Sequence, residues 1–208
     1  MSQFFSVHPE QPQLRLIRQA VEIIRGGGIV AFPTDAAYSL GCHIGDADAV
    51  ARIRKIRGVD ESHHFTLMCR DLSEISNFAK VDNAQFRLLK TVTPGSYTFI
   101  LEATKELPRR LLNPKRKTIG LRIPNHVLVL ALLEELNEPM LTSTLKLPDD
   151  ELPLNDVDEI RARLEHRVDL VIEAGHCGIE MTTVVDLSGA APVLIREGCG
   201  LVAPLGLD

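Results

Sequence analysis

Residues 28–41 read Gly28-Ile-Val-Ala-Phe-Pro-Thr-Asp-Ala-Ala-Tyr-Ser-Leu-Gly41, a short apolar run followed by a polar segment. The apolar part, 28–32, lies between a glycine and a proline, which is typical of a buried strand. Pro33-Thr34-Asp35 then predicts a turn at the end of that strand. Because α/β folds place ligands at the ends of their strands, the stretch indicates an α/β fold with a ligand site beginning at Thr34.

Helical and extended patterns alternate along the rest of the chain. Leu14, Ile17, Val21 and Ile24 have helical spacing and are followed by a run of three glycines, which predicts a helix over 14–25. Further helices are predicted at 46–57 with Asp46 as N-cap, 72–79, 83–89, 126–136 and 157–164. Further strands are predicted at 65–69, 97–103, 118–123, 140–145, 168–173, 182–187 and 193–196. The alternation is not strictly βαβ, so we expect one domain over 1–208, with a twisted, mixed sheet covered by helices.

Composition limits the classes of function. Hydrophobic residues make up 45% and aromatic residues 4% of the chain, so the core is predicted to be aliphatic. Few aromatics also argue against a sheet that stacks RNA bases. The net charge is -5, whereas a dedicated nucleic-acid binder is usually basic, so any RNA role requires a local patch of positive charge.

Cysteine and histidine spacing gives little indication of a metal site. The four cysteines form no C-x-x-C pair, which favours buried reduced thiols over a four-thiolate zinc site. His63 and His64 are adjacent, and chain neighbours rarely bind one ion, so we expect surface or loop histidines. The N-terminus does not resemble a secretory signal, and no apolar run approaches the roughly 18 residues that span a bilayer. We therefore expect a cytoplasmic protein without a metal site or a membrane partner.

Six polar segments lie at predicted strand ends, turns or helix ends. They are 33–41, Lys55-Ile56-Arg57, Arg122-Ile-Pro-Asn-His126, Thr142-Ser143-Thr144, Thr182-Thr-Val-Val-Asp186, and Arg196 within Ile-Arg-Glu-Gly. Lys55 and Arg57 either complement the dipole at the end of their helix or converge on a polyphosphate. Arg122 ends an apolar strand and needs an anionic partner, because a lone charge is costly to desolvate.

The order and wording of these segments resemble the YrdC/YciO family, and the YciO branch in particular. The resemblance rests on PTDAAYSLG, KIR, TPGSYTFIL, LRIPNH, TTVVDL and LIREG, and runs from about Leu14 to Gly198. It implies an open α/β fold whose twisted sheet surrounds a large, concave, positively lined cavity. Members of the YrdC type make threonylcarbamoyl-adenylate from threonine, bicarbonate and ATP, release pyrophosphate, and so supply the threonylcarbamoyladenosine modification of tRNA.

The same resemblance implies roles for individual residues. Lys55 and Arg57 match the K-x-R pair and would act catalytically, neutralising charge on the phosphates. Phosphate-binding positions would be Lys55, Arg57, Thr144, Lys146 and Arg196. Substrate-binding positions would be Thr34, Tyr38, Cys69, Thr98, Arg122, Thr142 and Thr183, with Arg122 taking a carboxylate. Mg²⁺ would accompany ATP, held mainly by phosphates and water.

Three positions depart from the synthase pattern. Thr144-Leu145-Lys146 stands where synthases carry S-x-N, and Cys69 stands where they usually carry histidine. Gly58-Val59-Asp60 replaces G-R-P after K-x-R. Lys146 brings a cation in place of an amide, which removes an acceptor. The departures leave the cavity in place but put the synthase reaction in question.

Two alternatives to a synthase remain open from the sequence. A double-stranded RNA or tRNA-binding module would use a basic run beside the cavity segments: Lys105, Arg109, Arg110, Lys115, Arg116 and Lys117. A solvated loop explains the same run, because Glu102 and Glu106 dilute its charge. The other alternative is a different phosphate-dependent reaction or a small-ligand sensor. The oligomeric state is not indicated.

Overall fold

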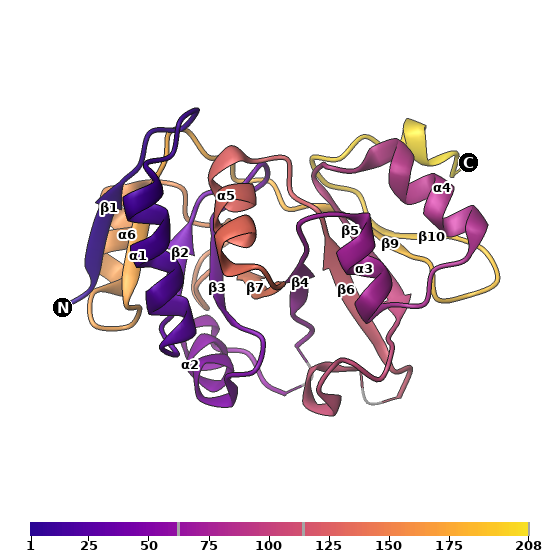
Figure 1. The fold of residues 1–208 in the computed structure, drawn as a ribbon, viewed down its shortest axis with the longest axis horizontal. Helices are drawn as coiled ribbons and strands as arrows, with labels where there is room; N and C mark the ends of the chain where they lie inside the picture. The colour runs from indigo at the N-terminus through magenta and orange to yellow at the C-terminus, as the bar shows by residue number, and fades with distance from the viewer. Residues whose placement is uncertain (62, 114, 208) are drawn as a thin grey trace.

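A single ten-stranded mixed sheet organises the computed structural model, which describes residues 1–61, 63–113 and 115–207 (Figure 1). The strands lie in the order β1 (Gln3–Ser6), β8 (Leu170–Glu173), β2 (Val30–Phe32), β3 (Ser39–His43), β7 (Met140–Thr144), β4 (Thr66–Met68), β6 (Thr118–Arg122), β5 (Tyr97–Glu102), β9 (Thr183–Asp186) and β10 (Val193–Arg196). Four neighbouring pairs are parallel (β1 with β8, β8 with β2, β4 with β6, and β5 with β9), and the other pairs are antiparallel. This confirms the predicted mixed α/β fold.

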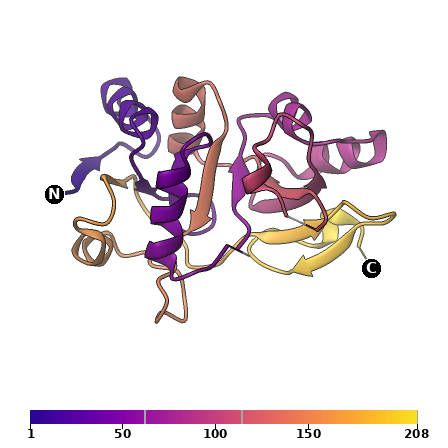
Figure 2. The same ribbon diagram turned by 90° about the horizontal axis from the view of Figure 1, so that it is seen from below.

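Helices cover both faces of the sheet. They are α1 (Leu14–Arg25), α2 (Ala47–Arg57), α3 (Leu72–Phe78), α4 (Asn83–Val92), α5 (Val127–Leu136) and α6 (Val157–Leu164). Figure 2 shows α1 and α5 together on one face and α2 and α6 on the opposite face, while α3 and α4 lie over the half that contains β5 and β6. The N-terminus lies at one end of the sheet and the C-terminus at the other (Figures 1 and 2).

Strand β2 shows why the core forms on both faces. Val30 and Phe32 join an apolar cluster with residues of α1 and α5, whereas Ala31 between them joins the larger cluster on the opposite side. All three are fully buried. Successive side chains of a strand point to opposite faces, so a strand covered on both faces reads as the continuous apolar run seen in the sequence.

The predicted elements are present, most with ends shifted by one or two residues. Helix α1 has the predicted bounds, and Asp46 caps α2, its side chain accepting a hydrogen bond from the Ala49 amide. Helix α4 runs three residues beyond its predicted end. At the end of α2, Gly58 adopts a left-handed φ of 63° and stops the helix directly after Arg57.

Strands β1 and β3 were not predicted. Gln3–Ser6 pairs in parallel with Leu170–Glu173, a partner more than 160 residues away that the sequence does not indicate. Ser39–His43 follows the turn so closely that the sequence reads as one polar segment, yet it returns antiparallel to β2. Gly41 within it permits close packing, because a Cβ atom there would lie 2.7 Å from both Met140 Sδ and a Phe32 ring carbon.

The cap of α2 provides a test of how this helix is held. Asp46 Oδ1 lies 2.8 Å from the Ala49 backbone nitrogen. Asp46→Ala is expected to lower the free energy of unfolding by about 1 kcal/mol, because one amide loses its acceptor. Urea denaturation followed by circular dichroism measures the change. Asp46→Asn keeps an acceptor oxygen and is the matched control; an equal loss in both variants would contradict the capping role.

Candidate functional site

A cavity of about 570 Å³ opens between the end of α2 and the sheet half formed by β7, β4, β6, β5, β9 and β10. Its described lining holds four arginines, two histidines and eight serine or threonine hydroxyls, and contains no aspartate or glutamate. The arginines are Arg57, Arg116, Arg122 and Arg196. A cavity with this lining and this size suits an anionic ligand as large as a nucleotide.

Arg57 reaches the cavity from the last turn of α2. Its Nη1 donates hydrogen bonds to Ser143 Oγ at 2.7 Å and to the Thr144 carbonyl oxygen at 2.6 Å. Both acceptors are uncharged, so the guanidinium keeps its full positive charge for a ligand. Burial lowers the pKa of Arg57 from its ordinary value, which reflects how far this charge is removed from water.

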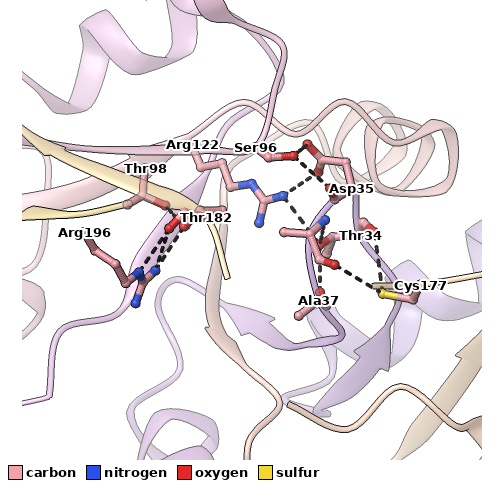
Figure 3. A network of polar contacts seen from close by, with 10 residues as sticks. Thr34, Asp35, Ala37, Ser96, Thr98, Arg122, Cys177, Thr182 and Arg196 are labelled. Carbon is pink, nitrogen blue, oxygen red and sulfur yellow. Dashed lines mark hydrogen bonds and ion pairs between the residues drawn. The ribbon is translucent and has the colours of Figure 1, made fainter. Parts of the chain in front are cut away.

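Arg122, at the end of β6, forms a buried ion pair with Asp35 in the turn after β2 (Figure 3). Its Nη2 also lies 3.5 Å from Thr34 Oγ1. Ser96 Oγ donates to the Asp35 carboxylate at 2.9 Å and lies 2.8 Å from its carbonyl oxygen, which fixes the acid in place. The expected anionic partner of Arg122 is therefore a side chain of the same protein, contributed by the turn that the sequence marked as a ligand site.

Arg196 lies across the cavity on β10 (Figure 3). Its Nε and Nη2 donate to the Thr182 carbonyl oxygen at 3.1 and 2.9 Å, and Thr182 Oγ1 lies 2.9 Å from Thr98 Oγ1. These partners are uncharged, as they are at Arg57. Burial lowers the pKa of Arg196 as well.

Arg116 is the one member of the predicted basic run that lines the cavity. Its Nη2 pairs with Asp186 on β9 at 2.6 Å and with Ser188 Oγ at the same distance. Desolvation raises the pKa of Asp186, but hydrogen bonds from Ser188 and the charge of Arg116 outweigh it, and the pKa is lowered. The other five basic residues are exposed and do not line the cavity, so the run does not form one continuous surface facing it.

His63 and His64 lie in the loop before β4, as the sequence interpretation expected, and both line the cavity. His63 Nε2 lies 3.1 Å from Ser143 Oγ, and its ring meets Phe65 edge-on. Burial, followed by the charges of Arg57, His64 and Arg54, lowers the pKa of His63 to about 4 although Asp60 raises it. His64 is exposed and lies 3.2 Å from Asn113.

The structure brings six of the predicted site residues to the cavity: Arg57, Thr98, Arg122, Thr142, Thr144 and Arg196. Thr34 lies just behind this lining, against Arg122. Ser143, Thr182 and Asp35 are further members of the site; each belongs to a segment that the sequence singled out, but none was among the residues predicted to bind. Their neighbours in those segments were the only sequence signal for them.

Besides Thr34, five predicted residues are not among those that line the cavity: Lys55, Tyr38, Cys69, Lys146 and Thr183. Lys55 is exposed, because residues two apart on a helix face different directions. The side chain of Thr183 points to the opposite face of the sheet from that of Thr182, and its hydroxyl donates a hydrogen bond to the Gly200 carbonyl oxygen. Tyr38 and Cys69 are buried in the larger apolar cluster, and the Tyr38 hydroxyl donates a hydrogen bond to the Ile172 carbonyl oxygen. The predicted convergence of Lys55 and Arg57 is therefore not seen.

The cysteines carry free thiols, three of them buried as predicted and Cys199 half-buried. Within residues 1–61, 63–113 and 115–207, no group of three or more potential metal-ligating side chains comes together. None of the helices in these ranges is both long enough and apolar enough to cross a membrane.

Comparison with known proteins places the chain among similar sequences and structures. The chain is 56% identical over 204 residues to YciO of Escherichia coli K12, covering 98% of this chain and 99% of that protein. It superposes on the crystal structure of E. coli YciO with a TM-score of 0.95, covering 99% of this chain and all of the other. Mouse threonylcarbamoyl-AMP synthase is 30% identical over 193 residues, which span 89% of this chain and 68% of the synthase.

A solved structure with a bound amino acid shares the architecture. The structure of P. abyssi Sua5 in complex with L-threonine has a TM-score of 0.86 at 26% identity, covering 94% of this chain and 57% of the Sua5 chain. The Sua5/YciO/YrdC family model, described as telomere recombination, matches residues 22–198, which include the cavity-lining residues named above. This chain belongs to the Sua5/YciO/YrdC family.

Proposed function

We propose that the cavity binds ATP and a small amino acid and catalyses the synthase reaction, in which threonine, bicarbonate and ATP yield threonylcarbamoyl-AMP and pyrophosphate. The observation that carries the proposal is the lining: four arginines and no carboxylate among its described residues. Attack of a carbamate on the α-phosphate joins two anions and expels a third, so the reaction depends on fixed positive charge. The kinship with threonylcarbamoyl-AMP synthases supports the choice of reaction.

The four arginines divide into two kinds, which suggests two subsites. Arg57 and Arg196 are held by hydroxyl and carbonyl groups and retain their net charge for a ligand. Arg116 and Arg122 are each paired with a carboxylate of the protein. Phosphates of ATP are therefore assigned to Arg57 and Arg196, with Thr144 beside Arg57. Lys146 and Lys55 lie outside the lining, so they would contribute only long-range positive charge toward the phosphates.

The amino-acid carboxylate is assigned to the Arg122 end of the cavity. Thr98 and Thr142 line the cavity and offer hydroxyls to a small polar substrate. Asp35 already neutralises Arg122, so a bound amino acid meets an ion pair, whose acid suits the ammonium group and whose guanidinium suits the carboxylate. Sua5 of P. abyssi was solved with L-threonine, which supports an amino acid as the second substrate.

Magnesium is proposed to enter with ATP. The described lining offers hydroxyls but no carboxylate, so it suits an ion already held by phosphates and water and does not form a binding site of its own. The ion would withdraw charge from the phosphates. The residues described here hold the nucleotide and exclude water.

RNA binding is the second candidate function. Arg110, in the basic run, donates to the Gly45 carbonyl oxygen at 2.7 Å, and Arg116 is occupied by Asp186. Lys105, Arg109, Lys115 and Lys117 are exposed and available for phosphates. An RNA role would use this outer surface, whereas nucleotide activation uses the cavity, so the two are separable by experiment.

Pyrophosphate release tests the proposed reaction directly. The purified protein is expected to release pyrophosphate from ATP only when threonine and bicarbonate are both present. A coupled assay with each substrate withheld in turn measures this. No release under any condition, together with salt-sensitive binding of double-stranded RNA, would overturn the proposal in favour of RNA binding.

Arg57→Ala tests the phosphate subsite. Loss of a charged donor is expected to weaken pyrophosphate or ATP binding roughly tenfold or more, measured by isothermal titration calorimetry. Lys55→Ala removes a cation from the same helix end but outside the cavity, and is expected to weaken binding less. Equal losses would show that net charge near α2 matters and that the position of Arg57 does not. Thermal denaturation of both variants checks that they remain folded.

Asp35→Ala tests the buried ion pair. It leaves Arg122 buried without its partner and is expected to lower the free energy of unfolding by about 3–5 kcal/mol, measured by urea denaturation. Added acetate is expected to restore part of that loss by taking the vacated position. Asp158→Ala breaks an exposed pair with Arg161 and is the matched control, expected to cost about 1 kcal/mol or less. Equal costs would contradict the importance of the buried pair.

A further inference from the structure

A chain of three side chains crosses one wall of the cavity, from Arg57 through Ser143 to His63. Arg57 Nη1 donates to Ser143 Oγ at 2.7 Å, and Ser143 Oγ lies 3.1 Å from His63 Nε2. A guanidinium can only donate, so the serine oxygen accepts from Arg57 and its own hydrogen can be donated to the imidazole. In the neutral tautomer of His63 with the proton on Nδ1, Nε2 is the acceptor of that hydrogen bond.

The charges facing His63 keep it in this neutral form. On α2, Arg57 and Arg54 oppose a second positive charge, and Arg54 also lies over the Phe65 ring at 5.1 Å. On its own loop, His64 acts in the same direction, while Asp60 favours protonation. The half-buried position of His63 adds a desolvation cost for the charged form. The free base is therefore the state present at neutral pH.

The proposed reaction releases one proton that needs an acceptor. The ammonium group of the amino acid first loses a proton to a base. The resulting amine then forms a bond to the carbon of bicarbonate, whose hydroxyl leaves with the second amine proton as water. The carbamate then attacks ATP, the bond to the leaving pyrophosphate breaks, and no further proton is released. One proton per turnover must therefore be taken up before the nucleotide step.

The cavity offers few groups for that proton. Its described lining has no carboxylate, and arginine does not act as a base at neutral pH. His63 and His64 are the described lining side chains whose ordinary titration lies near neutrality. His64 is exposed and engaged by Asn113, whereas His63 is half-buried and joined to the cavity wall through Ser143.

We propose that His63 is the proton acceptor of this cavity, receiving the ammonium proton through the Ser143 hydroxyl. The role of His63 in the amine step rests on the function proposed above. Its ability to accept a proton when an anion binds in the cavity does not depend on that function. Any polyanion bound against Arg57 cancels the positive charge that disfavours protonated His63, so anion binding increases its proton affinity. The same arginines lower the proton affinity of a nearby ammonium group. Both effects direct the proton from the amine to His63.

Nuclear magnetic resonance of the histidine side chains tests the acceptor without requiring any turnover. The imidazole of His63 is titrated with acid in the presence and absence of inorganic pyrophosphate. Pyrophosphate is expected to raise the proton affinity of His63 about tenfold or more and to leave exposed His166 unchanged. A titration midpoint of His63 that is the same with and without pyrophosphate would overturn the proposal, as would a larger shift of the midpoint at His64.

Kinetics then test the catalytic step. His63→Asn is expected to slow threonine-dependent pyrophosphate release about 100-fold and to abolish the fall in rate as the pH drops through the titration of His63. His166→Asn removes an exposed histidine with φ of 64°, a conformation that asparagine tolerates, and is the matched control. Loss of rate with an unchanged pH profile would show a structural role only and refute the acceptor. If the unaltered protein releases no pyrophosphate, the proposed reaction fails, while the resonance experiment still decides whether His63 accepts the proton.

Discussion

The pairing of β7 with β3 on one side and β4 on the other joins the two halves of the sheet, and the rest of the structure depends on it. Thr142 at its centre lies opposite Gly41 on β3 and Thr66 on β4, and its hydroxyl donates to the Thr66 carbonyl oxygen at 2.9 Å. This register places Thr142, Ser143 and Thr144 at the cavity. A slip of one residue would exchange the faces of the sheet to which their side chains point.

The cavity concentrates positive charge, and the protein meets the cost of burying that charge in two ways. Arg122 and Arg116 are paired with Asp35 and Asp186; the first pair is buried, whereas the second holds an arginine that is half exposed. Arg57 and Arg196 are held by neutral oxygens and leave their charge uncompensated. The first kind of arginine shapes the site, and the second kind makes it attract an anion.

The departures from the synthase pattern lie in two different places in the structure, the apolar core and the cavity wall. Cys69 is buried in the larger apolar cluster and burial raises its pKa, so this position contributes to core packing and not to the cavity surface. A histidine introduced there would be a buried polar group without an evident partner. Thr144 does line the cavity, but its carbonyl oxygen already accepts from Arg57, a contact that does not depend on its side chain.

The amino-acid sequence by itself determined most of the helices and strands, the glycine stop after α1, the Asp46 cap of α2 and most of the segments that form the site, because periodicity and capping are local properties. It also indicated that Arg122 needs an anion, since a lone buried charge is costly anywhere. Only the tertiary structure decided that this anion is Asp35, that Arg57 and not Lys55 faces the cavity, and that His63 meets Ser143. Those contacts join residues 80 or more positions apart, or depend on which way a helix is turned. Side-chain direction and long-range strand register arise from packing the whole sheet, and no local stretch of sequence specifies them.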